Sequence, residues 1–129
     1  MILDEIAVHN CITIQCHDNP DADALASGFG LYMYFSSLPN RRVKLIYSGR
    51  EHISKRNFLM MIEKLDIPII YVTDLYRPEG ILVTVDCQYG GGNVTKLLAN
   101  DVAVIDHHHP DILEDGILAD IRPDYGSCA

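Results

Sequence analysis

Five short apolar segments rich in β-branched residues alternate with longer segments of helical spacing, and this alternation constrains the fold more than any other feature. The apolar segments are Cys11–Cys16, Val43–Tyr47, Ile69–Val72, Ile81–Val85 and Val102–Ile105. Apart from Thr13 and Gln15 in the first segment, they show no polar alternation, which is typical of strands buried on both faces of a parallel sheet. We therefore predict an α/β fold, with a mostly parallel sheet of about five strands and helices on both faces.

Three of the intervening segments are expected to form helices. The longest runs from about Ala22 to Leu38, where Leu25 and Phe29 fall on one face. A second spans roughly Lys55 to Leu65, and a shorter third runs from about Asn93 to Ala99. The chain has 129 residues and no internal repeat or linker, so we expect one domain.

The composition is that of a globular chain with a negative net charge. Hydrophobic residues make up 48%, charged residues 22%, and the formal net charge is −8, which argues against generic nucleic-acid binding. No uncharged apolar run approaches the roughly 18 residues that suggest a membrane span, and the N-terminus lacks a signal-peptide pattern. We expect a cytoplasmic protein without a membrane partner.

Positive charge is concentrated in one stretch of the chain. Six of the ten Lys and Arg residues fall between positions 41 and 56. The stretch suits an anionic ligand, and Arg50 and Arg56 are the candidate substrate-binding residues within it. A solvated surface explains the same stretch equally well.

Residues that bear chemistry follow three of the five predicted strands. The segment His17–Asp23 follows the first strand and opens the longest helix, Asp86 follows the fourth strand, and Asp106–His109 follows the fifth. The carboxyl ends of parallel strands meet at one edge of a sheet, where such folds bind ligands. We therefore expect residues as far apart as His17 and Asp106 to lie in one crevice.

The residue types in that crevice indicate metal binding. Clustered carboxylates repel one another and lose hydration unless cations neutralise them. Mixed oxygen and nitrogen ligands suit Mn²⁺, Fe²⁺ or Zn²⁺ better than Mg²⁺, and the number of candidates suits two adjacent ions, as in phosphoryl-transfer hydrolases. Each motif alone has a plainer explanation, because an Asp-rich turn is often a helix cap and a lone Asp after a strand is often a turn former.

The order and spacing of these motifs resemble those of the DHH phosphoesterase superfamily. The matching motifs are His17-x-x-x-Asp21-x-Asp23, Asp86 after a strand, and Asp106-His107-His108 after the next strand. The family includes inorganic pyrophosphatases, single-strand-specific exonucleases, and enzymes that act on nanoRNA, phosphoadenosine phosphate and cyclic dinucleotides. The resemblance implies a hydrolase that uses two divalent cations, and we expect these to be Mn²⁺.

The resemblance also implies which residues ligate the metals. His17 and Asp21 would bind one Mn²⁺ ion, and Asp86 would bridge that ion to the second. Asp23 and His107 would complete the ligands of the second ion.

Two further residues are implied to be catalytic. Asp106 would orient the neighbouring imidazole, and His108 would bind or polarise the substrate phosphate. The family's fourth motif, another metal-ligating aspartate, has no match in this sequence. Asp115, Asp120 and Asp124 are the candidate substitutes, although their positions do not fit the motif.

These implications define the expected domain and function. Residues 1–129 are expected to be an incomplete N-terminal DHH domain, without the C-terminal substrate-binding domain and inactive alone. The expected activity is metal-dependent hydrolysis of a phosphoester bond in a nucleotide or short oligonucleotide. The alternatives are an inorganic pyrophosphatase and a non-catalytic nucleotide-binding regulatory module, and a homodimer is left open.

Overall fold

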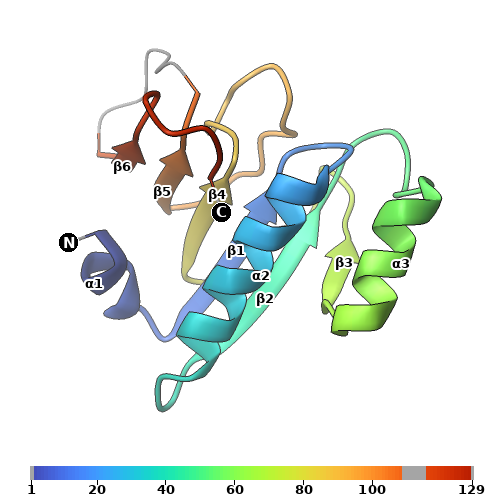
Figure 1. Ribbon diagram of the computed structural model, residues 1–129. Coiled ribbons are helices and arrows are strands. Elements are labelled where there is room, and N and C mark those ends of the chain that lie inside the picture. Colours follow the sequence, from blue (N-terminus) through green and yellow to red (C-terminus); the bar gives the residue numbers. More distant parts are fainter. Residues whose placement is uncertain (1, 109–115, 129) are drawn as a thin grey trace.

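The computed structural model of the chain describes residues 2–108 and 116–128 (Figure 1). Its helices are α1 (Ile2–Ala7), α2 (Ala22–Ser36) and α3 (Arg56–Leu65). Its strands are β1 (Cys11–Cys16), β2 (Arg42–Tyr47), β3 (Ile69–Tyr71), β4 (Ile81–Val85), β5 (Asp101–Asp106) and β6 (Leu118–Ile121). Among the described residues, no helix combines the length and the apolar character that crossing a bilayer requires.

The strands form one parallel sheet in the order β3-β2-β1-β4-β5-β6. The predicted α/β fold is therefore confirmed, with six strands in place of about five. The sixth strand is only four residues long and includes Asp120, so it carries no apolar run. Its pairing with β5, from Ala103↔Leu118 to Asp106↔Ile121, is what makes it a strand.

The order in which the strands are added to the sheet reverses between β1 and β4. From β1 the chain continues through β2 to β3 at one edge, and from β4 it continues through β5 to β6 at the other. Loops that leave neighbouring strands in opposite directions open a crevice at their carboxyl ends. The strands followed by the candidate residues, β1, β4 and β5, are consecutive neighbours in the sheet.

The main core lies between the sheet and the helices. Ile14 of β1 and Val83 of β4 are fully buried there against Leu25 and Phe35 of α2, and Ile6 of α1 belongs to the same cluster. Apolar side chains of α3 pack against this cluster as well. The three described helices thus share one face of the sheet, where helices on both faces were expected (Figure 1).

The opposite face is covered by an irregular segment, residues 87–100. Leu97 of this segment packs, fully buried, against Leu82 and Ile46 of the sheet. The prediction of a helix from Asn93 to Ala99 was wrong, because the backbone there bonds to neighbouring segments instead of to its own next turn. The carbonyl oxygen of Thr95, for example, accepts a hydrogen bond from Nε2 of the β1 residue Gln15 at 2.9 Å.

Helix α2 approaches the sheet closely at Gly28. A Cβ atom at this position would lie 2.8 Å from Cδ1 of Leu45 and 3.0 Å from Sγ of Cys16. Gly30 lies in the same helix, but a Cβ atom there would meet nothing within 4 Å. The absence of a side chain at Gly28 therefore sets how near the helix lies to β1 and β2.

We predict that Gly28→Val lowers the free energy of unfolding by about 1–3 kcal/mol more than Gly30→Val does. Both substitutions carry the same penalty of a β-branched residue in a helix, so their difference reports the crowding against Leu45 and Cys16. Urea unfolding followed by circular dichroism measures it. Equal losses in the two variants would contradict the close approach of α2.

Candidate metal centre

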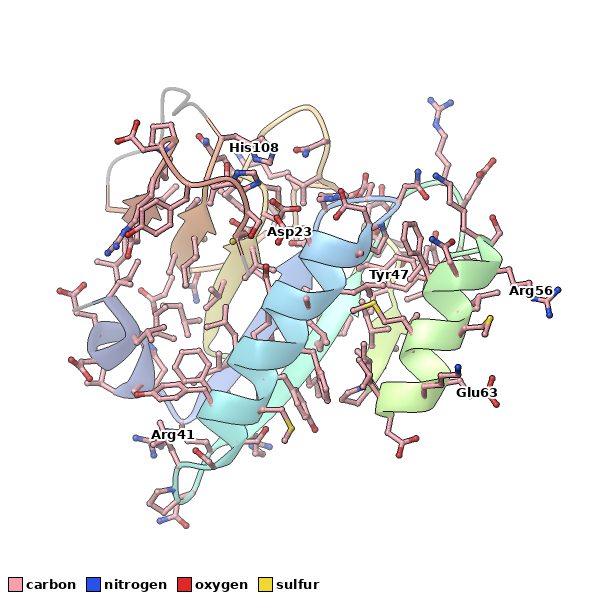
Figure 2. The ribbon with its side chains drawn as sticks, in the orientation of Figure 1. Asp23, Arg41, Tyr47, Arg56, Glu63 and His108 are labelled. Atoms are coloured by element: carbon pink, nitrogen blue, oxygen red, sulfur yellow. The ribbon has the colours of Figure 1, made fainter. Side chains whose placement is uncertain are left out.

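The first group of candidate residues is placed by the start of α2. Asp21 is the N-cap residue, and its Oδ1 accepts a hydrogen bond from the backbone N–H of Ala24 at 3.0 Å. Asp23 lies in the first turn, where the helix dipole favours a negative charge. Both carboxylates are therefore held at the carboxyl edge of the sheet, and Figure 2 shows Asp23 there, on the same side of the molecule as His108.

The centre of the site is the carboxylate of Asp86, which directly follows β4. The residue is only 2% exposed, and its φ of 57° is left-handed, a conformation that Asp adopts more readily than most residues. Its Oδ2 lies 3.5 Å from Nε2 of His17, and its Oδ1 lies 3.0 Å from Nε2 of His107. One buried carboxylate thus lies between two imidazoles that come from different strands.

Each imidazole also faces a second carboxylate. Nε2 of His17 lies 3.6 Å from Oδ1 of Asp21, and Nε2 of His107 lies 3.4 Å from Oδ2 of Asp23. The structure therefore brings together all five residues that the sequence suggested as metal ligands. They form two sets of one imidazole and two carboxylates, and Asp86 belongs to both.

The remaining ring nitrogen of each imidazole is held by a backbone carbonyl. Nδ1 of His17 lies 2.7 Å from the oxygen of Asp18, and Nδ1 of His107 lies 3.2 Å from the oxygen of Tyr125. A carbonyl oxygen only accepts hydrogen bonds, so each Nδ1 carries the proton. In the neutral ring, the lone pair is then on Nε2, which faces the carboxylates and suits a metal ligand.

The spacing and chemistry of these atoms fit divalent cations. Two ligand atoms that are each about 2.1 Å from one ion, at tetrahedral or octahedral angles, lie about 3.0–3.4 Å apart, close to the separations above. Oδ1 of Asp86 is buried and has no hydrogen-bond partner among the described residues, although Nε2 of His107 is near. A buried carboxylate oxygen without a donor is costly unless a cation neutralises it.

The pKa of His17 shows how strongly the carboxylates favour a positive charge. Burial lowers this pKa, but the bond to Asp86, the carbonyl of Asp18 and the charge of Asp21 outweigh burial and raise it to about 9. The site therefore attracts a proton when no metal neutralises it. A metal ion would have to displace that proton, because an imidazole ligand must be neutral.

Asp106 and His108 lie beside Asp86 and His107, and one ligand atom from each of these four residues lies within 4.8 Å of the others. Oδ1 of Asp106 lies 2.6 Å from Nδ1 of His108 and accepts the backbone N–H of His107 at 2.8 Å, while Oδ2 accepts Nε2 of Gln88 at 3.0 Å. Burial raises the pKa of Asp106, but these donors together hold it below its ordinary value. Asp106 thus orients His108, whose side chain is 52% exposed, whereas the ring of His107 is oriented by Tyr125.

The basic stretch does not form a single patch. Arg41 and Arg42 lie at the amino end of β2, while Arg50 lies in the loop at its carboxyl end, on the edge that carries the metal centre. Arg56 begins α3 and points away from the centre (Figure 2). Neither candidate substrate-binding arginine, Arg50 or Arg56, makes a hydrogen bond or ion pair with the described residues.

The remaining sequence candidates contribute little to this centre. Asp120 pairs with Arg122 at 2.8 Å, and Asp124 is exposed. Asp115 and His109 lie outside the described residues. The sequence did not single out Gln88, although it follows Asp86 by only two positions, because nothing in the sequence indicates that its amide meets Asp106.

Comparisons with known proteins bear on the family and the fold of the chain. The model of the DHH family, N-terminal domain, matches residues 11–129. No curated protein matches the chain. The crystal structure of an exopolyphosphatase-related protein from Bacteroides fragilis matches with a TM-score of 0.60 at 18% identity, over 98% of this chain and 40% of that one.

The two comparisons support different conclusions. At 18% identity, the likeness to the solved structure concerns the fold alone, and this chain spans only 40% of that protein's length. The family model extends from the first residue of β1 to the end of the chain and includes every motif residue of the metal centre. The chain therefore belongs to the DHH family, and its match is to the N-terminal domain of that family.

Proposed function

We propose that the protein hydrolyses a phosphoester bond with the aid of two divalent cations, most readily Mn²⁺. The observation that carries this proposal is the position of Asp86, whose two oxygens face two separate imidazole–carboxylate sets. A shared carboxylate is the ligand that holds two ions side by side, as in the two-metal sites of hydrolases that act on phosphates. Membership of the DHH family supports the same activity.

Two sets of residues, each with one imidazole, would hold the two ions. His17, Asp21 and Asp86 would hold the first ion, which we call site 1. Asp23 and His107, together with Asp86, would hold the second ion, which we call site 2. When bound, such ions acidify water and neutralise the charge of the phosphate.

The protein's own contribution to substrate binding is centred on His108. Its Nδ1 is fixed by Asp106, so its Nε2 is directed elsewhere and, on a half-exposed side chain, can donate a hydrogen bond to a phosphate oxygen. Asp106 stays ionised because Gln88 and the backbone N–H of His107 also donate to it. In the imidazolium form, whose two ring nitrogens both donate, Nε2 of His108 would face the negative charge that develops on the substrate.

The substrate proposed is a nucleotide or a short oligonucleotide. Beside His107, a pocket is lined by Arg122 and Tyr125, and the side chain of Tyr125 is largely exposed. An exposed aromatic ring at the rim of a phosphate site can stack on a nucleobase. Inorganic pyrophosphate or polyphosphate is the alternative, favoured by the description of the Bacteroides fragilis protein as exopolyphosphatase-related.

We predict that wild-type protein binds two Mn²⁺ ions and that Asp86→Asn weakens both, because the lost charge is shared. Phosphoesterase activity, measured on the full-length protein because residues 1–129 are expected to be inactive alone, should fall at least a hundredfold, in keeping with the loss of a metal ligand. Calorimetric titration measures the binding, and Asp101→Asn, an exposed position at the start of β5, is the matched control. Unchanged turnover in Asp86→Asn would refute the assignment of this residue, and two bound ions without turnover of any phosphoester would favour the non-catalytic module.

A second prediction separates the substrate classes. If the ring of Tyr125 stacks on a base, Tyr125→Leu raises the KM for a short oligonucleotide about tenfold, an effect of 1–3 kcal/mol per stacked base, and leaves the KM for pyrophosphate unchanged. Tyr125→Phe keeps the ring and should behave like wild type. Faster turnover of pyrophosphate than of any nucleotide substrate would show that the alternative is correct.

The raised pKa of His17 predicts how the metal-free protein responds to pH. A pKa of about 9 in the folded state, against 6.5 ordinarily, means that protonation stabilises the fold. This contribution is complete below about pH 6.5 and is lost as the pH rises through about 9. Urea unfolding in a chelator should show that stability falls across this range and that His17→Gln, which cannot titrate, loses less, whereas equal losses would contradict the ion pairing.

A further inference from the structure

Asp18 lies next to the metal ligand His17 but turns its side chain away from the metal centre. Its Oδ1 accepts the backbone N–H of Thr95 at 3.0 Å, and its Oδ2 accepts the hydroxyl of Thr95 at 2.8 Å. Its own backbone N–H donates to the carbonyl of Asn93 at 2.8 Å. Three hydrogen bonds therefore fasten the loop after β1 to residues 93–95, far away in the sequence.

The segment on the other side of these bonds is itself fixed to the sheet. The carbonyl of Thr95 accepts Nε2 of Gln15, a fully buried residue of β1. Thr95 is thus bonded both to the strand that leads into the metal centre and to the loop that follows it. It cannot move without breaking a hydrogen bond in the interior, where an unpaired polar group is costly.

Asp18 is also confined from the side of β2. A Cβ atom on Gly49 would lie 2.9 Å from Cβ of Asp18, and Gly49 has a φ of +111°. Only glycine adopts that conformation readily and leaves room for Asp18. The residue is therefore packed between the loop after β2 and the segment that contains Thr95.

The confined residue Asp18 contacts the ring of His17 through its backbone carbonyl oxygen. The carbonyl oxygen of Asp18 accepts the hydrogen bond from Nδ1 of His17 at 2.7 Å. Because the side chain and the N–H of Asp18 are both fastened, the direction of that carbonyl is fixed as well. It determines which nitrogen of His17 carries the proton and where Nε2 points.

We infer that Asp18 is a positioning residue for site 1: by bonding to Thr95 it fixes the carbonyl that aims Nε2 of His17 at the metal. The inference rests on the proposed function, since it assumes that His17 binds a metal. Asp18 is not one of the proposed ligands: its side chain is bonded to Thr95, and neither group of described residues that could hold an ion includes it. Site 2 does not depend on it, because His107 is aimed by Tyr125.

Because only site 1 should depend on Asp18, the inference can be tested by measuring metal binding at each site separately. Binding of Co²⁺, followed by its visible absorption spectrum, reports both affinity and ligand geometry. In a His107→Ala background only site 1 is intact, and in a His17→Ala background only site 2 is intact. The substitution Asp18→Ala is made in each background, with Asp74→Ala, at an exposed position, as the matched control.

We expect Asp18→Ala, which keeps the carbonyl but loses the side-chain bonds that fix its direction, to weaken Co²⁺ binding at site 1 by about tenfold, the lower end of the usual effect of disturbing a group that orients a histidine ligand. Site 2 should keep its affinity and its spectrum. Asp18→Asn should recover much of the loss, because its amide oxygen still accepts the N–H of Thr95 and its NH₂ group can donate to the hydroxyl oxygen.

A second variant protects the test against a general loss of structure. Thr95→Val keeps the volume and the backbone N–H but removes the hydroxyl that donates to Oδ2 of Asp18, so a smaller loss confined to site 1 is expected. Equal loss at both sites, or none at site 1, in variants that keep the wild-type circular dichroism spectrum, would overturn the inference. Failure of the wild-type protein to bind Co²⁺ would count against the proposed function instead.

Discussion

The buried carboxylate of Asp86 between two imidazoles is the interaction on which the rest of the site depends. Burying an ionised carboxylate is expensive unless opposite charge lies close to it. Here the charge can come from a proton on His17, as its raised pKa indicates, or from the cations proposed above. Asp21 and Asp23 add further negative charge beside the same two imidazoles, His17 and His107. Positive charge among these acids therefore offsets the free-energy cost of bringing them together.

The sheet topology makes this concentration of charge possible. The loops after β1 and β4 leave neighbouring strands in opposite directions, and Asp86 lies at this point, where parallel sheets form a crevice at the carboxyl ends of their strands. The close approach of α2 at Gly28 then places Asp21 and Asp23 beside it. Backbone carbonyls from two different loops complete the site by aiming the imidazoles, so that Nε2 of each ring faces the carboxylates.

Much of the fold and most of the site could be predicted from local sequence. Cys11–Cys16 and Ile81–Val85 are strands with the predicted bounds, because an apolar, β-branched run can bury both faces only inside a sheet. The metal-ligand candidates could be found because each motif directly follows such a strand. Arg50 and Arg56 were chosen only for their charge. The charge of a residue does not tell whether its side chain points toward the candidate site.

The sequence by itself determined which residues belong to the carboxyl edge of the sheet, since strand ends and polar motifs are local features. Tertiary structure alone decided which of them touch. Residues 93–99 follow an irregular path because Thr95 finds its hydrogen-bond partners in Gln15 and Asp18, and β6 is a strand because β5 is beside it. Such partners are distant in the chain, and no local pattern encodes them, because a hydrogen bond depends on position in space.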